Sequence, residues 1–251
     1  MILDNQQILN MRACGQILKN ALFDAVAKAT PGTSCNRLDQ IAENALLHQK
    51  ATPSFKNYLV EGIGRYPFTI LTSVNNEVVH GLPVKNKILK DGDIVSIDIG
   101  AIYKGVCTDM TVTVGVGNIS PKAQNLIDKT RISLEKGIDS IKIGGHIGDI
   151  GHAVQTYAES FGYGVVRDLV GHGIGTKPHM TPQIPNFGRQ GTGMKIRNGM
   201  GLAIEPMITA GDFHIKAGDD DWTVLTVDGS LAAHFEHTIV MIDDEAVVVT
   251  R

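Results

Sequence analysis

The sequence predicts an α+β protein in which helices cover an antiparallel sheet. Along its 251 residues the predicted elements run helix, helix, strands, and then helix, helix, strands again. No Gly-x-Gly-x-x-Gly turn follows a predicted strand and no phosphate-binding loop occurs, so the signatures of a nucleotide-binding parallel sheet are missing.

Four segments have the apolar spacing of amphipathic helices. Asp4 is a suitable N-cap for the first, and Ser120 with Pro121 provides a cap and a first-turn proline for the third. Gly162 is placed to end the fourth. The predicted helices cover residues 4–28, 35–49, 120–136 and 147–161.

Strand-like runs fill much of the remaining sequence. One contains Pro206, which cannot donate to a sheet ladder, so we expect an edge, a break or a bulge there. The predicted strands cover residues 68–74, 94–103, 106–114, 202–207, 223–227, 235–241 and 246–249.

The outline of the chain suggests an internal repeat. A glycine-led turn opens an amphipathic helix at residues 32–46 and again at 144–158. This outline is compatible with a single domain, 1–251, built from two related halves, roughly 1–119 and 120–251. Two unrelated helical hairpins would explain it equally well.

Composition excludes several classes of protein. The formal net charge of −3 gives no basic footprint for nucleic acid, and no apolar run approaches the roughly 18 residues that cross a bilayer. The first ten residues lack the basic start and apolar stretch of a signal peptide. The three cysteines form no Cys-x-x-Cys pair, which argues against a disulfide scaffold or zinc ribbon and favours the reducing cytoplasm.

Four acidic residues and one histidine are the strongest candidates for a functional site: Asp98, Asp109, His172, Glu205 and Glu236. They form a hard, mostly oxygen ligand set. A single ion does not need four anionic side chains. Two adjacent divalent ions do, because bridging carboxylates hold both and offset their repulsion. We therefore expect a dinuclear metal centre that activates water for hydrolysis.

The first two candidates fall on a predicted hairpin. If Lys104-Gly105 is a two-residue turn, Asp109 faces Gly100, and Asp98 lies two residues further along the same face. Such diagonal neighbours are about 7–8 Å apart at the backbone. A one-residue change in loop length would send the carboxylates to opposite faces. Two exposed aspartates on a solvated strand are the alternative.

The other three candidates are weaker in isolation. Glu205 stands in an apolar run, where a carboxylate either faces solvent or is compensated by a cation. His172 lies between two glycines, which allow close approach of the backbone, although a lone histidine is more often a surface or packed residue. Glu236 shares a strand face with His234, whereas His237 alternates to the opposite face and is left out of the ligand set.

Taken together, the motifs resemble those of type I methionine aminopeptidases in their compact bacterial form. They occur in that family's order and at close to its spacing over nearly the whole chain. Each motif alone is weak, but their combined register is specific. The matching segments are Asn76-Glu77-Val78-Val79-His80-Gly81, Asp98 with Asp109, Gly171-His172-Gly173-Ile174-Gly175 with His179, Ile204-Glu205-Pro206-Met207 and Phe235-Glu236-His237-Thr238.

The resemblance implies a pita-bread fold, in which two pseudo-symmetric halves close round a curved antiparallel sheet covered by helices. It implies removal of the initiator methionine from nascent proteins and peptides whose second residue is small. It also implies two divalent ions, from among cobalt, manganese, iron, zinc and nickel. By carry-over, Asp98 chelates one ion, His172 and Glu205 bind the other, and Asp109 and Glu236 bridge the two.

The resemblance also implies roles on the substrate side. Glu205 takes the proton of the attacking water and passes it to the leaving amine. His179 stabilises the developing oxyanion, and His80 orients the amide nitrogen. Tyr66 and Trp222 help to form the pocket for the methionine side chain.

The sequence departs from the family pattern around this pocket. The segment 54–67 looks longer than usual. Ile63 and Leu71 stand where an aromatic residue and a cysteine are common, and Pro178 replaces a frequent aromatic residue. Met207 is a further residue that we expect to line the site.

Two alternatives remain at this point. An Xaa-Pro peptidase of the same fold would share the ligands, although such enzymes usually carry a large additional N-terminal domain. A non-catalytic binding module on this fold would be expected to have lost ligands. We expect the N-termini of nascent chains as partners, and neither nucleic acid nor membrane. We also expect a monomer. Lys85, Lys87 and Lys90 form a local patch for a weak ribosome contact.

Overall fold

The computed structural model describes residues 2–251, and four helices lie among them. The Asp4 carboxylate accepts the Gln7 N–H at 2.8 Å, and the Ser120 hydroxyl accepts the Ala123 N–H at 3.1 Å, so both predicted caps are present. All four predicted helices are confirmed, with ends that shift by a few residues. They are α1 (Asn5–Val26), α2 (Cys35–His48), α3 (Pro121–Asp139) and α4 (Ile147–Glu159).

Every strand pair of the described chain is antiparallel, as predicted. The first sheet has the order β1-β6-β4, with β7 also paired to β6, and the largest has the order β10-β9-β11-β16-β17. Three smaller sheets are β15-β12-β8, β13-β14-β5 and β2-β3. The strands are β1 (Thr52–Pro53), β2 (Leu59–Val60), β3 (Gly64–Arg65), β4 (Ile70–Val74), β5 (Glu77–Val79), β6 (Ile94–Tyr103), β7 (Val106–Gly115), β8 (Gly164–Val165), β9 (Gly171–Gly173), β10 (Met180–Ile184), β11 (Gly201–Ile204), β12 (Met207–Thr209), β13 (Ile215–Ala217), β14 (Val224–Thr226), β15 (Ala232–His234), β16 (His237–Ile242) and β17 (Glu245–Val248).

The hairpin of β6 and β7 has the predicted register. Lys104 and Gly105 form its turn with φ of 47° and 79°, the positive values that a tight two-residue hairpin turn requires. Gly100 lies opposite Asp109, and Asp98 lies opposite Thr111. The two aspartates therefore share one face of the hairpin.

Two predicted strands are interrupted beside acidic residues. The run 202–207 is divided into β11 and β12 by Glu205 and Pro206, as the proline indicates. The run 235–241 begins its ladder only at His237, while Glu236 forms an isolated bridge with Thr111 of β7. Glu205 and Glu236 thus sit where regular pairing stops, and their side chains are free to serve a site.

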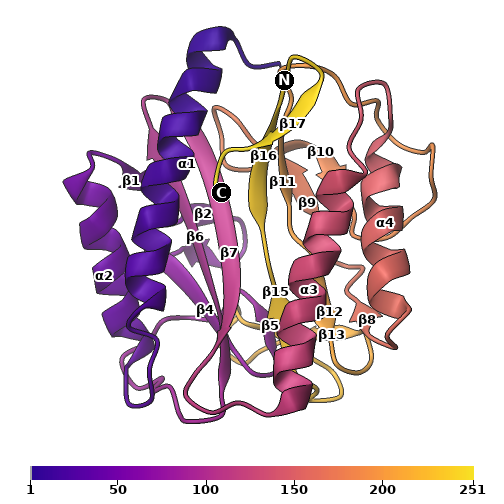
Figure 1. Cartoon of the computed structure of the whole chain (residues 1–251). Helices are drawn as coiled ribbons and strands as arrows, with labels where there is room; N and C mark the ends of the chain where they lie inside the picture. Colours follow the sequence, from indigo (N-terminus) through magenta and orange to yellow (C-terminus); the bar gives the residue numbers. More distant parts are fainter. Residues whose placement is uncertain (1) are drawn as a thin grey trace.

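The helices lie in two pairs over the sheets. In Figure 1, α1 and α2 flank the β6–β7 hairpin, whereas α3 and α4 lie over the later strands. β7 and β16 run side by side at the centre, where the Thr111–Glu236 bridge joins the two sheets. The division into halves 1–119 and 120–251 stays a prediction.

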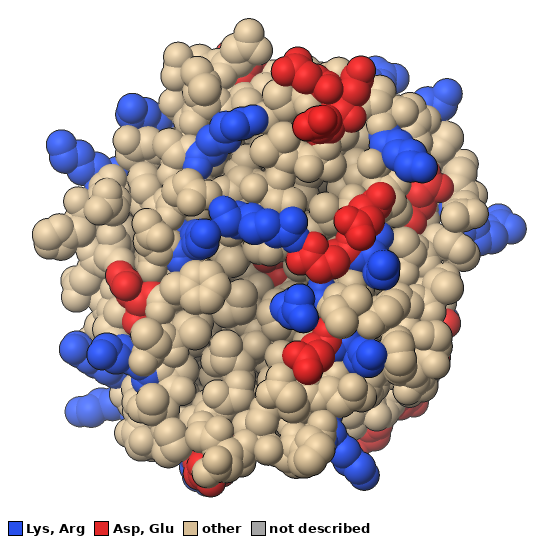
Figure 2. Space-filling view, in the orientation of Figure 1, with Lys and Arg blue, Asp and Glu red and all other residues tan. Residues whose placement is uncertain are grey.

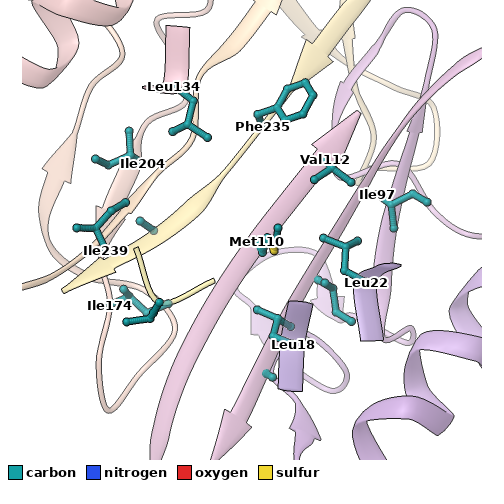
Figure 3. Close-up of a cluster of buried hydrophobic side chains, with 14 of the residues drawn as sticks. Leu18, Leu22, Ile97, Met110, Val112, Leu134, Ile174, Ile204, Phe235 and Ile239 are labelled. Carbon is teal, nitrogen blue, oxygen red and sulfur yellow. The ribbon is translucent and has the colours of Figure 1, made fainter. Parts of the chain in front are cut away.

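A continuous apolar core runs beneath both helix pairs. Figure 3 shows Leu18 and Leu22 of α1 with Met110 of β7, and Leu134 of α3 near Ile204 of β11, within this core. On the surface, Figure 2 shows basic and acidic groups interspersed on one face. Within residues 2–251 no helix is both long and apolar enough to cross a membrane.

The N-terminal helix packs closely against the end of the chain. The Gln16 side-chain amide donates to the carbonyl oxygens of Val249 and Arg251 at 3.1 and 3.0 Å. A Cβ added at Gly15 would overlap the Val249 carbonyl group. Glycine at this position is therefore required by the contact between α1 and the C-terminal segment.

Replacing Gly15 with alanine should lower the free energy of unfolding by about 1–3 kcal/mol, because overpacking outweighs the better helix propensity of alanine. Urea unfolding measures the change. Leu9 of the same helix is 60% exposed, and Leu9→Ala should change stability by less than about 0.5 kcal/mol. A Gly15→Ala protein as stable as the wild type would contradict the close contact.

Candidate metal centre

All nine residues predicted for the site line one cavity of about 310 Å³. One side is acidic and carries imidazoles, and the other is apolar. The cavity is lined by Phe55, Tyr58, Val60, Ile63, Tyr66, Leu71, His80, Asp98, Asp109, His172, His179, Glu205, Trp222 and Glu236. Residues separated by more than 150 positions in the sequence are thus brought together by the fold.

Thr111 holds Glu236 beside the two aspartates. The Glu236 N–H donates to the Thr111 carbonyl oxygen at 2.9 Å, and the Thr111 hydroxyl donates to Glu236 Oε2 at 3.1 Å. Thr111 also faces Asp98 across the hairpin. One residue of β7 therefore fixes the position of Glu236 relative to both carboxylates of the hairpin.

His172 enters the cavity from β9, and Glu205 enters it from the residue that directly follows the neighbouring β11. β9 pairs with β11 through His172 and Ala203, two residues before Glu205. The glycines on either side of His172 are needed, because an added Cβ at each would overlap a backbone carbonyl. His172 Nδ1 donates to the Gly173 carbonyl oxygen at 3.0 Å, which leaves Nε2 as an acceptor, 3.5 Å from Glu205 Oε1.

The candidate ligand atoms form overlapping groups of three, and the atoms of each group lie close enough together to bind one ion. Asp98, Asp109 and Glu236 offer atoms within 4.8 Å of one another, and so do His172, Glu205 and Glu236. Glu236 belongs to both groups, and a third group joins Asp109 to His172 and His179. Buried oxygens of Asp98 and Glu236 have no hydrogen-bond partner among the described residues. A divalent cation fits this donor set.

Burial makes the cluster resist ionisation when no cation is present. It raises the pKa of Asp98 to about 7. The pKa values of Asp109, Glu205 and Glu236 also rise well above the ordinary range, first through burial and then through repulsion by the neighbouring carboxylates. Burial and nearby His179 lower the pKa of His172 to about 4, so its ring is neutral and available as a ligand.

Aromatic rings form the apolar wall. Tyr66 is buried, its hydroxyl donates to the Ile70 carbonyl oxygen at 2.7 Å, and its ring lies edge-on to Trp222 at 5.2 Å. Leu71 is buried beside them, whereas Ile63 is 45% exposed at the rim. This wall suits an apolar side chain in its polarity.

His179 and His80 stand at the edge of the cavity, between its two sides. The His179 ring lies 4.5 Å from His172 and 5.4 Å from Tyr58. His80 has a φ of 61° and directly follows β5, whose pairing with β14 brings it close to the Trp222 segment. Both histidines therefore reach the space between the carboxylates and the apolar wall.

Met207 does not line this cavity, contrary to our expectation. It is buried in a separate apolar cluster with Val78, Val79 and Val166. Pro206 ends the preceding strand, and Met207 belongs to β12, which pairs with β15 and β8. The change of sheet at Pro206 turns this side chain away.

Other residues near the site were not predicted. Phe55, Tyr58 and Val60 lie in a segment with weak periodicity, so only the fold reveals them as cavity walls.

His234 is buried with Nε2 3.6 Å from Glu205 Oε2. Its place two residues before Glu236 on the same strand face was the signal that could have identified it. His237 instead contacts the Thr250 hydroxyl at 2.9 Å and is not among the residues that line the cavity.

An antiparallel fold with a buried cluster of carboxylates and a histidine defines a class of metal-dependent hydrolases. Comparison with known proteins gives the family. Residues 9–243 match the model of metallopeptidase family M24, and the chain belongs to this family.

Relatives of this chain are methionine aminopeptidases. That of Clostridium acetobutylicum is 45% identical over 250 residues, covering 100% of this chain and 98% of that protein. Methionine aminopeptidase 1 of Bacillus subtilis is 44% identical over 241 residues, covering 96% and 95%. The crystal structure of the Thermotoga maritima methionine aminopeptidase superposes with a TM-score of 0.96 at 42% identity, covering 100% and 99% of the two chains.

A more distant structure shares the fold alone. Prolidase from Pyrococcus furiosus has a TM-score of 0.79 at 19% identity, and this chain covers 65% of it. The predicted pita-bread fold is confirmed by these neighbours together with the antiparallel sheets and flanking helices.

Binding of a divalent ion should release protons below neutral pH. With a pKa of about 7, Asp98 is mostly protonated at pH 6 in the metal-free protein, and a neighbouring cation displaces that proton. Calorimetric titration with Mn²⁺ in buffers of different ionisation enthalpy should show release of about one proton or more at pH 6, and fewer at pH 8.

Asp98→Asn should reduce this release, whereas Asp24→Asn, at an exposed position on α1, should not. Proton-neutral binding by the wild type at pH 6 would contradict the raised carboxyl pKa values.

Proposed function

We propose that this protein is a methionine aminopeptidase that removes the N-terminal methionine from peptides and nascent proteins whose second residue is small. The observation that carries the proposal is the single cavity in which a cluster of four carboxylates and a histidine faces an aromatic wall. A metal-binding side beside an apolar pocket suits an exopeptidase that holds a free amino group at one end and a methionine side chain at the other.

The ligand assignment follows from the overlapping groups in the cavity. Asp98 would bind one ion, and His172 and Glu205 would bind the second. Asp109 and Glu236 would bridge them, which is supported because each of these carboxylates shares one group with Asp98 and another with His172. Manganese, iron, cobalt, zinc and nickel all suit such a donor set.

The chemistry needs a nucleophile, a proton carrier and stabilisation of the developing charge. Bound divalent ions lower the pKa of water and polarise the scissile carbonyl. Glu205 accepts the proton of the attacking water and delivers it to the leaving amine. His179 donates to the developing oxyanion, and His80 orients the amide nitrogen. Both imidazoles lie at the cavity edge, where a peptide bond would pass between the metal side and the solvent.

The apolar wall supplies selectivity for the first residue. Tyr66 and Trp222 would enclose the methionine side chain, with Leu71 at the base and Ile63 at the rim. Ile63 and Leu71 are departures from the common family residues, but both are apolar and line the cavity, so the pocket keeps its polarity. Pro178 adjoins His179, which packs against Tyr58 instead of a neighbouring aromatic residue.

Glu205→Gln should lower kcat for Met-Ala-Ser by at least about 10²-fold, because the amide cannot carry the proton. The control Glu245→Gln makes the same chemical change at an exposed strand position and should keep wild-type activity. Peptide hydrolysis is followed in metal-reconstituted protein, with metal content measured.

Two results would redirect the proposal. Cleavage of Ala-Pro or Met-Pro in preference to Met-Ala-Ser would favour an Xaa-Pro peptidase. Binding of Met-Ala-Ser without turnover, with each of the five metals supplied in turn, would favour a non-catalytic binding module.

We also propose that the enzyme acts on nascent chains in the cytoplasm, as a monomer that contacts the ribosome. Part of the expected lysine patch is engaged elsewhere. Lys87 contacts Glu77 at 2.7 Å and the Thr72 carbonyl oxygen at 3.1 Å, whereas Lys85 and Lys90 are exposed.

Cosedimentation with ribosomes should occur at about 50 mM salt and weaken at about 200 mM, since the contact is electrostatic. A Lys85→Glu/Lys90→Glu protein should cosediment less while keeping peptidase activity. Equal cosedimentation of the variant and the wild type would count against this patch.

A further inference from the structure

His234 is a buried neighbour of Glu205 that none of the proposed steps uses. It ends β15 and is 2% exposed. Its Nε2 atom lies 3.6 Å from Glu205 Oε2 and has no hydrogen-bond partner among the described residues. A buried polar atom without a partner is costly, so its position beside this carboxylate calls for a physical reason.

The Glu205 carboxylate lies between two imidazoles, one on each oxygen. Oε1 is 3.5 Å from His172 Nε2, and Oε2 is 3.6 Å from His234 Nε2. His172 does not donate to Glu205. Its Nδ1 carries the proton and donates it to the Gly173 carbonyl oxygen, so its Nε2 keeps a lone pair. His234 is the imidazole whose Nε2 is available as a donor to Glu205.

The backbone holds His234 at this distance. The His234 N–H donates to the Thr113 hydroxyl at 2.9 Å, and that hydroxyl donates to the His234 carbonyl oxygen at 2.7 Å. Across the β12–β15 ladder, His234 faces Met207, which lies two residues after Glu205. The spacing between the ring and the carboxylate is therefore set by paired strands.

We propose that His234 is a positioning residue for Glu205, donating from Nε2–H to Oε2 so that Oε1 stays turned toward His172 and the metal. A small rotation of the Glu205 side chain closes the gap to hydrogen-bond distance, about 2.8–3.0 Å. A carboxylate held in this way keeps Oε1 for the metal and has a fixed orientation as the group that transfers the proton. Partners of this kind typically change metal affinity or activity by about 10–100-fold.

This inference rests on the proposed function, because Glu205 is the residue that binds the ion and moves the proton. Two substitutions of His234 distinguish the effect of losing a hydrogen-bond donor from the effect of losing packing. His234→Gln retains an N–H donor near the same position, whereas His234→Leu fills the space without one. His48→Gln provides a matched control at an exposed position on α2.

Two readouts are measured on the full chain: Mn²⁺ affinity by calorimetry, and kcat and KM for Met-Ala-Ser. His234→Leu should weaken Mn²⁺ binding and lower kcat, each by about 10–100-fold, with little change in KM. His234→Gln should recover most of both, and His48→Gln should match the wild type. Wild-type metal affinity and kcat in His234→Leu, or a folded His234→Gln that is as impaired as His234→Leu, would overturn the proposal.

A measurement on the wild type covers the case in which the variants do not fold. Nitrogen NMR of ¹⁵N-histidine protein loaded with Zn²⁺ should show the His234 proton on Nε2, and a proton on Nδ1 alone would overturn the proposal. Absence of peptidase activity in the wild type would overturn the proposed function instead, because metal affinity and the ring tautomer test His234 without turnover.

Discussion

Four carboxylates share one buried cavity, and the rest of the structure depends on how their mutual repulsion is offset. Hydrogen bonds from Thr111 to Glu236 and from the Met110 N–H to Asp109 compensate only part of the cost. The ion pairs that lysine and arginine make within residues 2–251 lie elsewhere. Bound protons offset the repulsion in the metal-free protein, as the raised carboxyl pKa values indicate, and divalent cations take their place on binding.

A rigid frame is needed to keep such a cluster together before any ion binds. Asp98 and Asp109 are held by a long two-stranded ladder, and Glu236 is joined to that ladder through Thr111. His172 and Glu205 are held by strands of the other large sheet. The site thus lies where two sheets meet, and the interruptions beside Glu205 and Glu236 free these side chains from regular alternation.

The sequence predicts those parts of the structure that depend on local chemistry. Helix caps, the turn at Lys104-Gly105 and the break at Pro206 could all be found because each depends on residues adjacent in the chain. The convergence of the ligands was implied by family resemblance, since no local pattern determines how two sheets join. Met207 was wrongly expected to line the site for that reason, because its position depends on the β12–β15 pairing, which the sequence of a three-residue strand does not indicate. His234 was not predicted, although its spacing from Glu236 was a usable local signal.

The two sides of the cavity meet on the β4–β6 ladder, but the apolar wall has a further support of its own. Hydrogen bonds to α2 support the apolar wall. The buried carboxylate of Asp39, in α2, accepts the N–H groups of Thr69 and Ile70 at 2.7 and 2.9 Å. None of these contacts involves a metal ligand. Ile63 lies 45% exposed between β2 and β3, so a substitution there can reshape the proposed pocket while the carboxylate geometry stays fixed. Leu71 instead lies opposite Asp98 on the β4–β6 ladder, so a substitution there reaches both the pocket and a proposed metal ligand. Selectivity and hydrolytic chemistry are thus separable at the rim of the cavity and coupled where the wall meets the hairpin.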